Sequence, residues 1–247
     1  MKKVFTVHGF QSNSSAMYKF VDVLENALPH DKAVRDIKVY QLDWESGVPS
    51  GKMERVLSFL SSPRIYGEKT INAWDEAQNN ISKAAQKLAY NVNLRSTPSE
   101  IILIVAHSMG TQVVLESLDM IDKENKIFLL LMGGISSEME YAMLDSYENV
   151  IGAFNLYSTN DFILERLLSE ISFYSTSAIG TTSISSDKVI NIETNFGHSE
   201  YMESDYVLRH LYLRKCLGIK PSPLESFVEE VSEAWSELKN SLRISKL

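Results

Sequence analysis

The stretch AHSMG at 106–110 places a serine where an apolar run changes into a helix-like pattern. The run at 101–106 is typical of a strand, and the apolar positions after Gly110 have helical spacing. A tight turn from strand to helix exposes the serine hydroxyl at a helix N-terminus, which is the arrangement of a nucleophile elbow. Ala106 stands where the first glycine of such a turn is more usual. Ser108 is therefore a candidate nucleophile, although a serine before a helix can also be only an N-cap.

A serine hydroxyl needs a histidine to take its proton and a carboxylate to orient that histidine. His198 fits the first role, because it follows the apolar run at 188–192 and a glycine on a late loop. A solvated loop histidine is the alternative. Asp161 fits the second role, since it comes just after the strand-like run at 150–157 and just before a helix. Asp161 could instead only cap that helix, and Glu138 is the rival acid.

We assign no catalytic role to the other four histidines. His8 ends the first strand-like run, His30 lies in a polar stretch, and His210 lies within a helical pattern. His107 adjoins the serine, and we expect it to point elsewhere.

Attack on an acyl carbon also requires two backbone donors for the developing oxyanion. The Met109 amide follows the nucleophile and is one candidate donor. The Phe10 amide is the other, because the His8-Gly9 pair after the first strand lets the backbone bend toward the site. A plain turn after the strand is the alternative.

The elements that must hold these residues alternate between strands and helices. Short apolar runs indicate strands, and their lack of polar alternation favours a mainly parallel sheet that is buried on both faces. These runs are at 3–7, 37–44, 101–106, 127–132, 150–157 and 188–192. Helical spacing predicts an amphipathic helix at about 70–92. The segment 47–69 is a candidate lid insertion, with a surface loop and a half-buried helix as the alternative.

The C-terminal segment 219–247 begins within the linker GIKPSP, and after this linker it carries a helical stripe of apolar residues. This stripe consists of Leu224, Phe227, Val228, Val231, Trp235, Leu238 and Leu242. We expect a domain at 1–218, with the C-terminal helix packed on it. A homodimer or partner contact through 224–242 is the alternative.

Composition limits the function classes further. A net charge of -8 argues against broad attraction to nucleic acid or anionic lipid, since both need a basic surface. Cys216 is the only cysteine, so no intrachain disulfide and no Cys/His zinc motif is expected, and a cytoplasmic location is the natural interpretation. The sequence contains neither a signal-peptide pattern nor an apolar run of the roughly 20 residues that would span a membrane.

The residues HGF, AHSMG, STND and GH, in this order, resemble the α/β-hydrolase superfamily. LDWES at 42–46, NLYSTNDFIL at 155–164 and GHSEY resemble more narrowly a hydrolase-like branch found in transmembrane and coiled-coil-domain proteins. The resemblance implies a three-layer α/β-hydrolase fold, here with about six strands and without the first two antiparallel ones. It also implies a serine esterase or lipase that forms an acyl-enzyme on ester or lipid substrates, without metal or organic cofactor. The alternative function is a binding or scaffold protein that acts through its lid or C-terminal helix.

Overall fold

A computed structural model describes residues 2–10, 12, 17–27, 37–47, 63–98, 100–165 and 177–202. Its strands are β1 (Lys2–Val7), β2 (Ile37–Leu42), β3 (Ile101–His107), β4 (Lys126–Met132), β5 (Val150–Tyr157) and β6 (Val189–Glu193). Its α-helices are α1 (Tyr18–Ala27), α4 (Pro63–Arg95), α5 (Gly110–Ser117) and α6 (Glu138–Tyr141). The described residues also form the short 3₁₀ helices η2 (Leu118–Met120), η3 (Ala142–Ser146) and η4 (Glu200–Met202), and residues 162–165 are helical.

All six strands join one parallel sheet in the order β2-β1-β3-β4-β5-β6. The six predicted runs are thus confirmed as strands, and so is the predominantly parallel sheet. Because the strands are parallel, all of their carboxyl ends meet at the same edge. Loops that follow different strands therefore come together there, which is where ligands of open α/β sheets bind.

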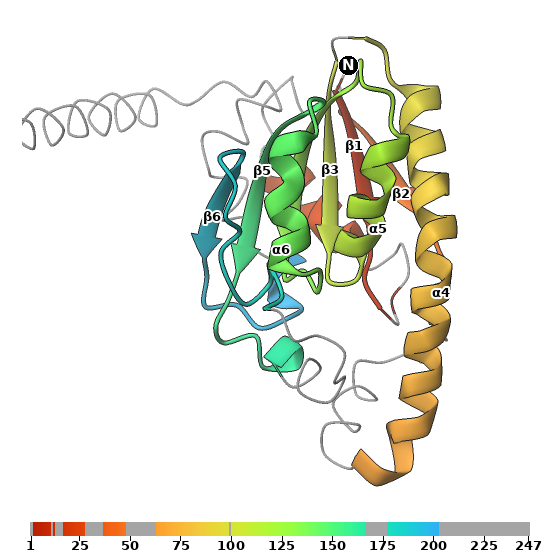
Figure 1. Cartoon of the computed structure of the whole chain (residues 1–247), viewed down its shortest axis with the longest axis vertical. Helices are drawn as coiled ribbons and strands as arrows, with labels where there is room; N and C mark the ends of the chain where they lie inside the picture. Colours follow the sequence, from red (N-terminus) through yellow and green to blue (C-terminus); the bar gives the residue numbers. More distant parts are fainter. Residues whose placement is uncertain are drawn as a thin grey trace, which may run out of the picture.

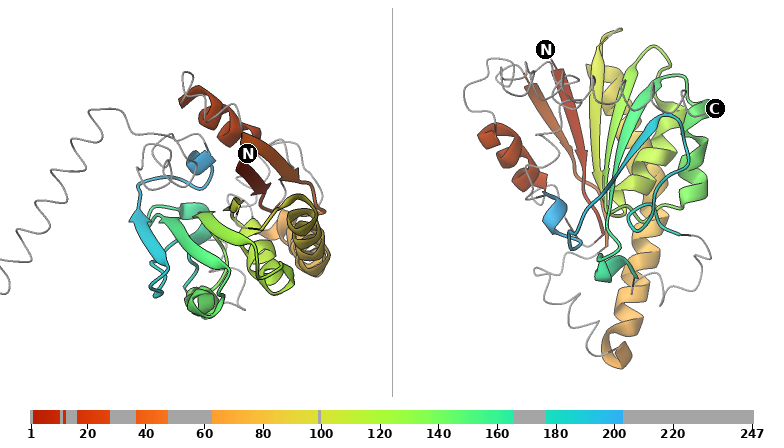
Figure 2. Two further views of the ribbon diagram at one scale, coloured as in Figure 1. Left: turned by 90° about the horizontal axis from the view of Figure 1, so that it is seen from above. Right: turned by 90° about the vertical axis from the view of Figure 1, so that its left-hand side faces the viewer.

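Both faces of the sheet are covered, which explains why the central strands β3 and β4 are apolar at almost every position. Along β3, Ile102 and Ile104 belong to one buried cluster, whereas Leu103 and Val105 belong to the cluster on the opposite face. Helices α4, α5 and α6 cover the face that carries Ile102 and Ile104 (Figure 1). Helices α1 and η4 cover the opposite face (Figure 2). The chain thus has the predicted three-layer α/β architecture.

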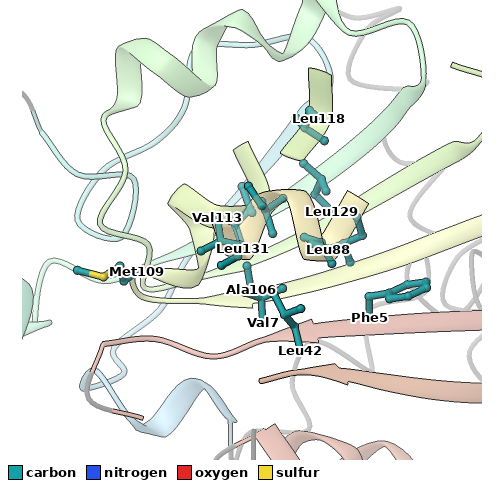
Figure 3. Close-up of a cluster of buried hydrophobic side chains, with 14 of the residues drawn as sticks. Phe5, Val7, Leu42, Leu88, Ala106, Met109, Val113, Leu118, Leu129 and Leu131 are labelled. Atoms are coloured by element: carbon teal, nitrogen blue, oxygen red, sulfur yellow. The ribbon is translucent and has the colours of Figure 1, made fainter. Parts of the chain in front are cut away.

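The larger cluster joins β1, β3 and β4 to the helices α4 and α5. Phe5, Ala106 and Leu129 of the sheet meet Leu88 of α4 and Val113 of α5 (Figure 3). This packing fixes α5 directly behind the carboxyl end of β3. The site described below therefore stands on a rigid support.

Helix α4 is longer than the predicted 70–92. It begins at Pro63, a residue well suited to a first helical turn, and it ends shortly before Pro98, which restricts the residue preceding it. Residues 63–69 of the candidate lid therefore belong to this helix, and residues 48–62 lie outside the described residues.

The predicted C-terminal helix at 219–247 also lies outside the described residues. Within the described part of the chain, no helix has both the length and the apolar character needed to cross a membrane.

Candidate active site

The turn between β3 and α5 has the geometry expected of a nucleophile elbow. Ser108 has a φ of 54°, in the left-handed region that a non-glycine residue rarely adopts. Its amide donates to the Met132 carbonyl at 3.1 Å, which ties the turn to the neighbouring strand. Gly110 allows α5 to start close to β1, because a Cβ there would lie 2.5 Å from the Val7 carbonyl oxygen. The glycine two positions after the serine is thus required by packing.

The side chain of Ser108 does not cap α5. Met109 occupies the N-cap position and makes no side-chain capping bond. The Ser108 Oγ atom lies instead 3.0 Å from Nε2 of His198. The N-cap alternative for Ser108 is therefore wrong.

His198 continues the hydrogen-bonded path to Asp161. Its Nδ1 lies 2.8 Å from Oδ2 of Asp161, whose side chain is fully buried. A carboxylate oxygen only accepts hydrogen bonds, so Nδ1 carries the proton and Nε2 is left with a lone pair facing Ser108. This tautomer is the one that accepts a proton from a serine hydroxyl.

Asp161 also caps the helix that begins at residue 162, as the alternative interpretation expected. Its Oδ1 accepts a hydrogen bond from the Leu164 amide at 3.0 Å. The two oxygens therefore serve the helix and His198 at the same time. The rival acid Glu138 lies in α6, and its Oε1 accepts from the Ser185 amide at 3.0 Å.

The predicted oxyanion donors stand beside the serine. Gly9 lies so close that a Cβ on it would be 2.6 Å from Cβ of Ser108, and Phe10 follows it directly. The Phe10 ring packs edge-on against Trp74, with centroids 5.2 Å apart. Among the described residues, neither the Phe10 amide nor the Met109 amide donates a hydrogen bond to another residue.

His107 does not point away from the site as expected. Its Nε2 lies 2.6 Å from the backbone carbonyl oxygen of His198, and the two imidazole rings are 4.7 Å apart. Burial is the main reason that the pKa of His107 is lowered to about 3, with the nearby His198 as a second cause. Sequence reasoning missed this contact, although the position of His107 at the end of β3 was a signal for it.

His8 lies near the elbow but contacts neither His198 nor Asp161. Its Nδ1 lies 3.1 Å from the Gly9 carbonyl oxygen, and its ring stacks on Trp44. Burial lowers the pKa of His8, while the Gly9 carbonyl and Asp43 oppose that shift. His30 and His210 lie outside the described residues.

A metal ion would need several His, Cys, Asp or Glu side chains close together. Within the part of the chain that the structure describes, no group of three or more His, Cys, Asp or Glu side chains is arranged to hold a metal ion. Acyl transfer by a serine, a histidine and an aspartate uses only side chains and backbone amides.

Comparison with known proteins gives a family and a set of similar folds. Residues 65–214 match the model of a family described as "Protein of unknown function (DUF726)". No curated protein matches the sequence.

Three solved structures illustrate the likeness of fold. A variant of SOBER1 from Arabidopsis thaliana has a TM-score of 0.44 at 12% identity, over 85% of this chain and 99% of that chain. A Xanthomonas campestris protein assigned to the α/β superfamily of hydrolases has a TM-score of 0.41 at 10% identity, over 89% and 95%. A cold-adapted esterase from an Arctic intertidal metagenomic library has a TM-score of 0.45 at 15% identity, over 87% and 82%. The likeness concerns the fold.

Proposed function

The chain belongs to the DUF726 family, and we propose that it is a serine hydrolase of the esterase or lipase type that cleaves carboxylic esters. The observation that carries this proposal is the continuous path from Ser108 Oγ through His198 to Asp161, with separations of 3.0 Å and 2.8 Å. Both separations are hydrogen-bonding distances, and the start of α5 has no side-chain capping bond that would occupy the Ser108 hydroxyl.

In the first step Ser108 Oγ attacks the carbonyl carbon of the ester, and its proton passes to Nε2 of His198. The imidazolium that forms is stabilised by the buried Asp161 carboxylate at Nδ1. The negative charge moves to the carbonyl oxygen of the substrate, where the Phe10 and Met109 amides donate to it. The positive end of the α5 dipole, which starts at Gly110, acts in the same direction.

Collapse of the tetrahedral intermediate breaks the bond to the alcohol, which leaves with the proton held by His198. A water molecule then attacks the acyl-enzyme, and His198 takes a proton from that water in the same way. The acid is released, and the Ser108 hydroxyl is restored. The resemblance of the motifs to those of α/β-hydrolases supports carboxylic esters as substrates, and thioesters and amides would react through the same residues.

The test is covalent labelling of the full chain with an alkyl fluorophosphonate, with the modified residue located by peptide mass spectrometry. We expect label on Ser108 only, none on S108A, and labelling of H198A slower by about a hundredfold or more, since the base is lost. Circular dichroism of both variants controls for folding. Equal labelling of S108A and wild type would disprove the assignment of the nucleophile.

A further inference from the structure

We propose that His107 is a positioning residue, which holds the backbone of the His198 loop and thereby aligns the His198 imidazole between Ser108 and Asp161. Its effect on rate rests on the proposed function. Its effect on the geometry of His198 does not, and the two are measured separately below.

The loop that carries His198 needs such an attachment. It follows β6, which is one of the two edge strands of the described sheet. Among the described residues, two hydrogen bonds join the backbone of residues 195–202 to a residue outside that segment. The Phe196 amide donates to Oγ1 of the nearby Thr194, and the His107 bond is the one that reaches a distant part of the chain. The other backbone bonds of the segment stay local, such as Glu200 amide to Gly197 carbonyl and Gly197 amide to Glu200 Oε2.

His107 is well placed to supply it, because it stands on the rigid part of the molecule. It is the last residue of β3, at the middle of the sheet, and it pairs in register with Met132 of β4. Its side chain is buried, so the bond to the His198 carbonyl is shielded from water. The bond therefore fixes the position of the loop relative to the sheet.

Ring packing restrains the same loop. The His107 ring lies 4.7 Å from the His198 ring and 6.3 Å from the Tyr201 ring, and Phe196 packs edge-on against Tyr201 at 5.6 Å. His107 thus contacts residues on both sides of the loop's turn. Removal of its donor alone, with the ring volume roughly conserved, separates the hydrogen bond from the packing.

The protonation state of His107 suits this role. A carbonyl oxygen only accepts, so Nε2 of His107 carries the proton and donates. Burial holds the ring neutral at neutral pH. A second positive charge 4.7 Å away would oppose the imidazolium that His198 becomes during the reaction. A neutral donor avoids that repulsion.

The test compares three variants of His107 that differ in the presence and position of a side-chain hydrogen-bond donor. In H107Q the side-chain amide nitrogen reaches the place of Nε2, whereas in H107N it reaches only the place of Nδ1. H107L has no donor but retains apolar volume. Thermal unfolding establishes that each full-length variant is folded, and H107L replaces H107N as the donor-free case if H107N does not fold.

Two readouts are taken on each variant. The first is the rate of fluorophosphonate labelling of Ser108, for which we expect a loss of about 10- to 100-fold in H107N and H107L and near wild-type rates in H107Q. The second is the downfield proton NMR signal of His198 Nδ1–H in ¹⁵N-histidine-labelled protein, which reports its bond to Asp161. We expect this signal in the wild type and H107Q, and its loss in H107N and H107L.

The outcomes separate the two proposals. If the wild type is not labelled, the proposed function fails, and the NMR signal alone decides whether His107 positions His198. If H107N and H107L keep both the signal and the wild-type labelling rate, or if H107Q loses as much as they do, the positioning role is overturned.

Discussion

The two carboxylate oxygens of Asp161 accept hydrogen bonds from two different donors. Oδ2 accepts from His198, and Oδ1 accepts from the Leu164 amide at the start of the following helix. A single substitution can separate these duties, because asparagine keeps one acceptor oxygen and replaces the other by an NH₂ group. The amide oxygen would serve the helix, and the NH₂ group would face His198 Nδ1.

We therefore predict that D161N folds but is nearly inactive. The NH₂ group forces the proton of His198 onto Nε2, the wrong tautomer for accepting a proton from Ser108, and labelling should slow by about 10³- to 10⁴-fold. The measurement is the fluorophosphonate labelling rate, with the melting temperature as the check on folding.

The control for D161N is E138Q, since Glu138 is the rival acid and its Oε1 contact with the Ser185 amide survives as an amide oxygen. We expect wild-type labelling for E138Q. A slow E138Q beside a fast D161N would transfer the acid role to Glu138.

Sequence reasoning found the residues of the hydrogen-bonded path because residue type, order and the nearby strand ends are all readable. Ser108, Asp161 and His198 follow three different strands whose carboxyl ends meet at one edge of the sheet. The role of His107 was not readable in this way. The direction of a side chain at a strand end depends on the loop that it meets, and the contact with that loop spans 91 residues in the sequence.

At the scale of elements, the elbow depends on the close approach of α5 to β1. The approach takes place at Gly110, where a Cβ would lie 2.5 Å from the Val7 carbonyl oxygen and 2.9 Å from that of His8. These are backbone atoms at the carboxyl end of β1 and directly after it, which cannot move aside without disturbing the sheet.

We predict that G110A destabilises the protein by about 1–3 kcal/mol, as overpacking does, and slows the labelling of Ser108. Urea unfolding measures the free energy, and labelling measures the site. The matched control is G197A, where the nearest atom to the added Cβ is 3.7 Å away, so ordinary contact results. If G110A and G197A are equally stable, tight packing at the elbow is not what requires glycine.

The elements were predictable to different degrees. The strands β3 and β4 stand out most clearly, because burial on both faces makes them apolar at almost every position. The first turns of α4 were missed, because they lie where Pro, Gly and Ser had suggested a loop. Helix α6 is too short for periodicity to show, yet Ser137 and Glu140 form a capping box that was a readable signal.

At the scale of the whole molecule, two buried histidines link stability to pH. Burial lowers the pKa of His107 to about 3 and also lowers that of His8, below an ordinary value of 6.5. Between about pH 3 and 6.5 the unfolded chain therefore binds more protons than the folded one. The free energy of unfolding must then decrease as the pH falls through this window.

We predict that replacing His107 with glutamine, which does not titrate, makes the stability less dependent on pH. The slope of unfolding free energy against pH should fall by up to about 1.4 kcal/mol per pH unit near pH 5, which corresponds to one proton. Urea unfolding at several pH values between 4 and 7 measures both slopes. Identical slopes for H107Q and wild type would show that His107 titrates alike in both states.

The left-handed backbone of Ser108, with its φ of 54°, affects the stability of variants at this position independently of their activity. Such a conformation costs a non-glycine residue about 1–2 kcal/mol, and glycine avoids most of that cost. S108G should therefore be more stable than S108A by up to about 1 kcal/mol, although neither has a nucleophile. Calorimetry of this pair measures the difference, and equal or lower stability of S108G would contradict it. Of the two inactive variants, the one with glycine would then be the more robust protein, because the backbone of this turn, and not the lost hydroxyl, sets the difference between them.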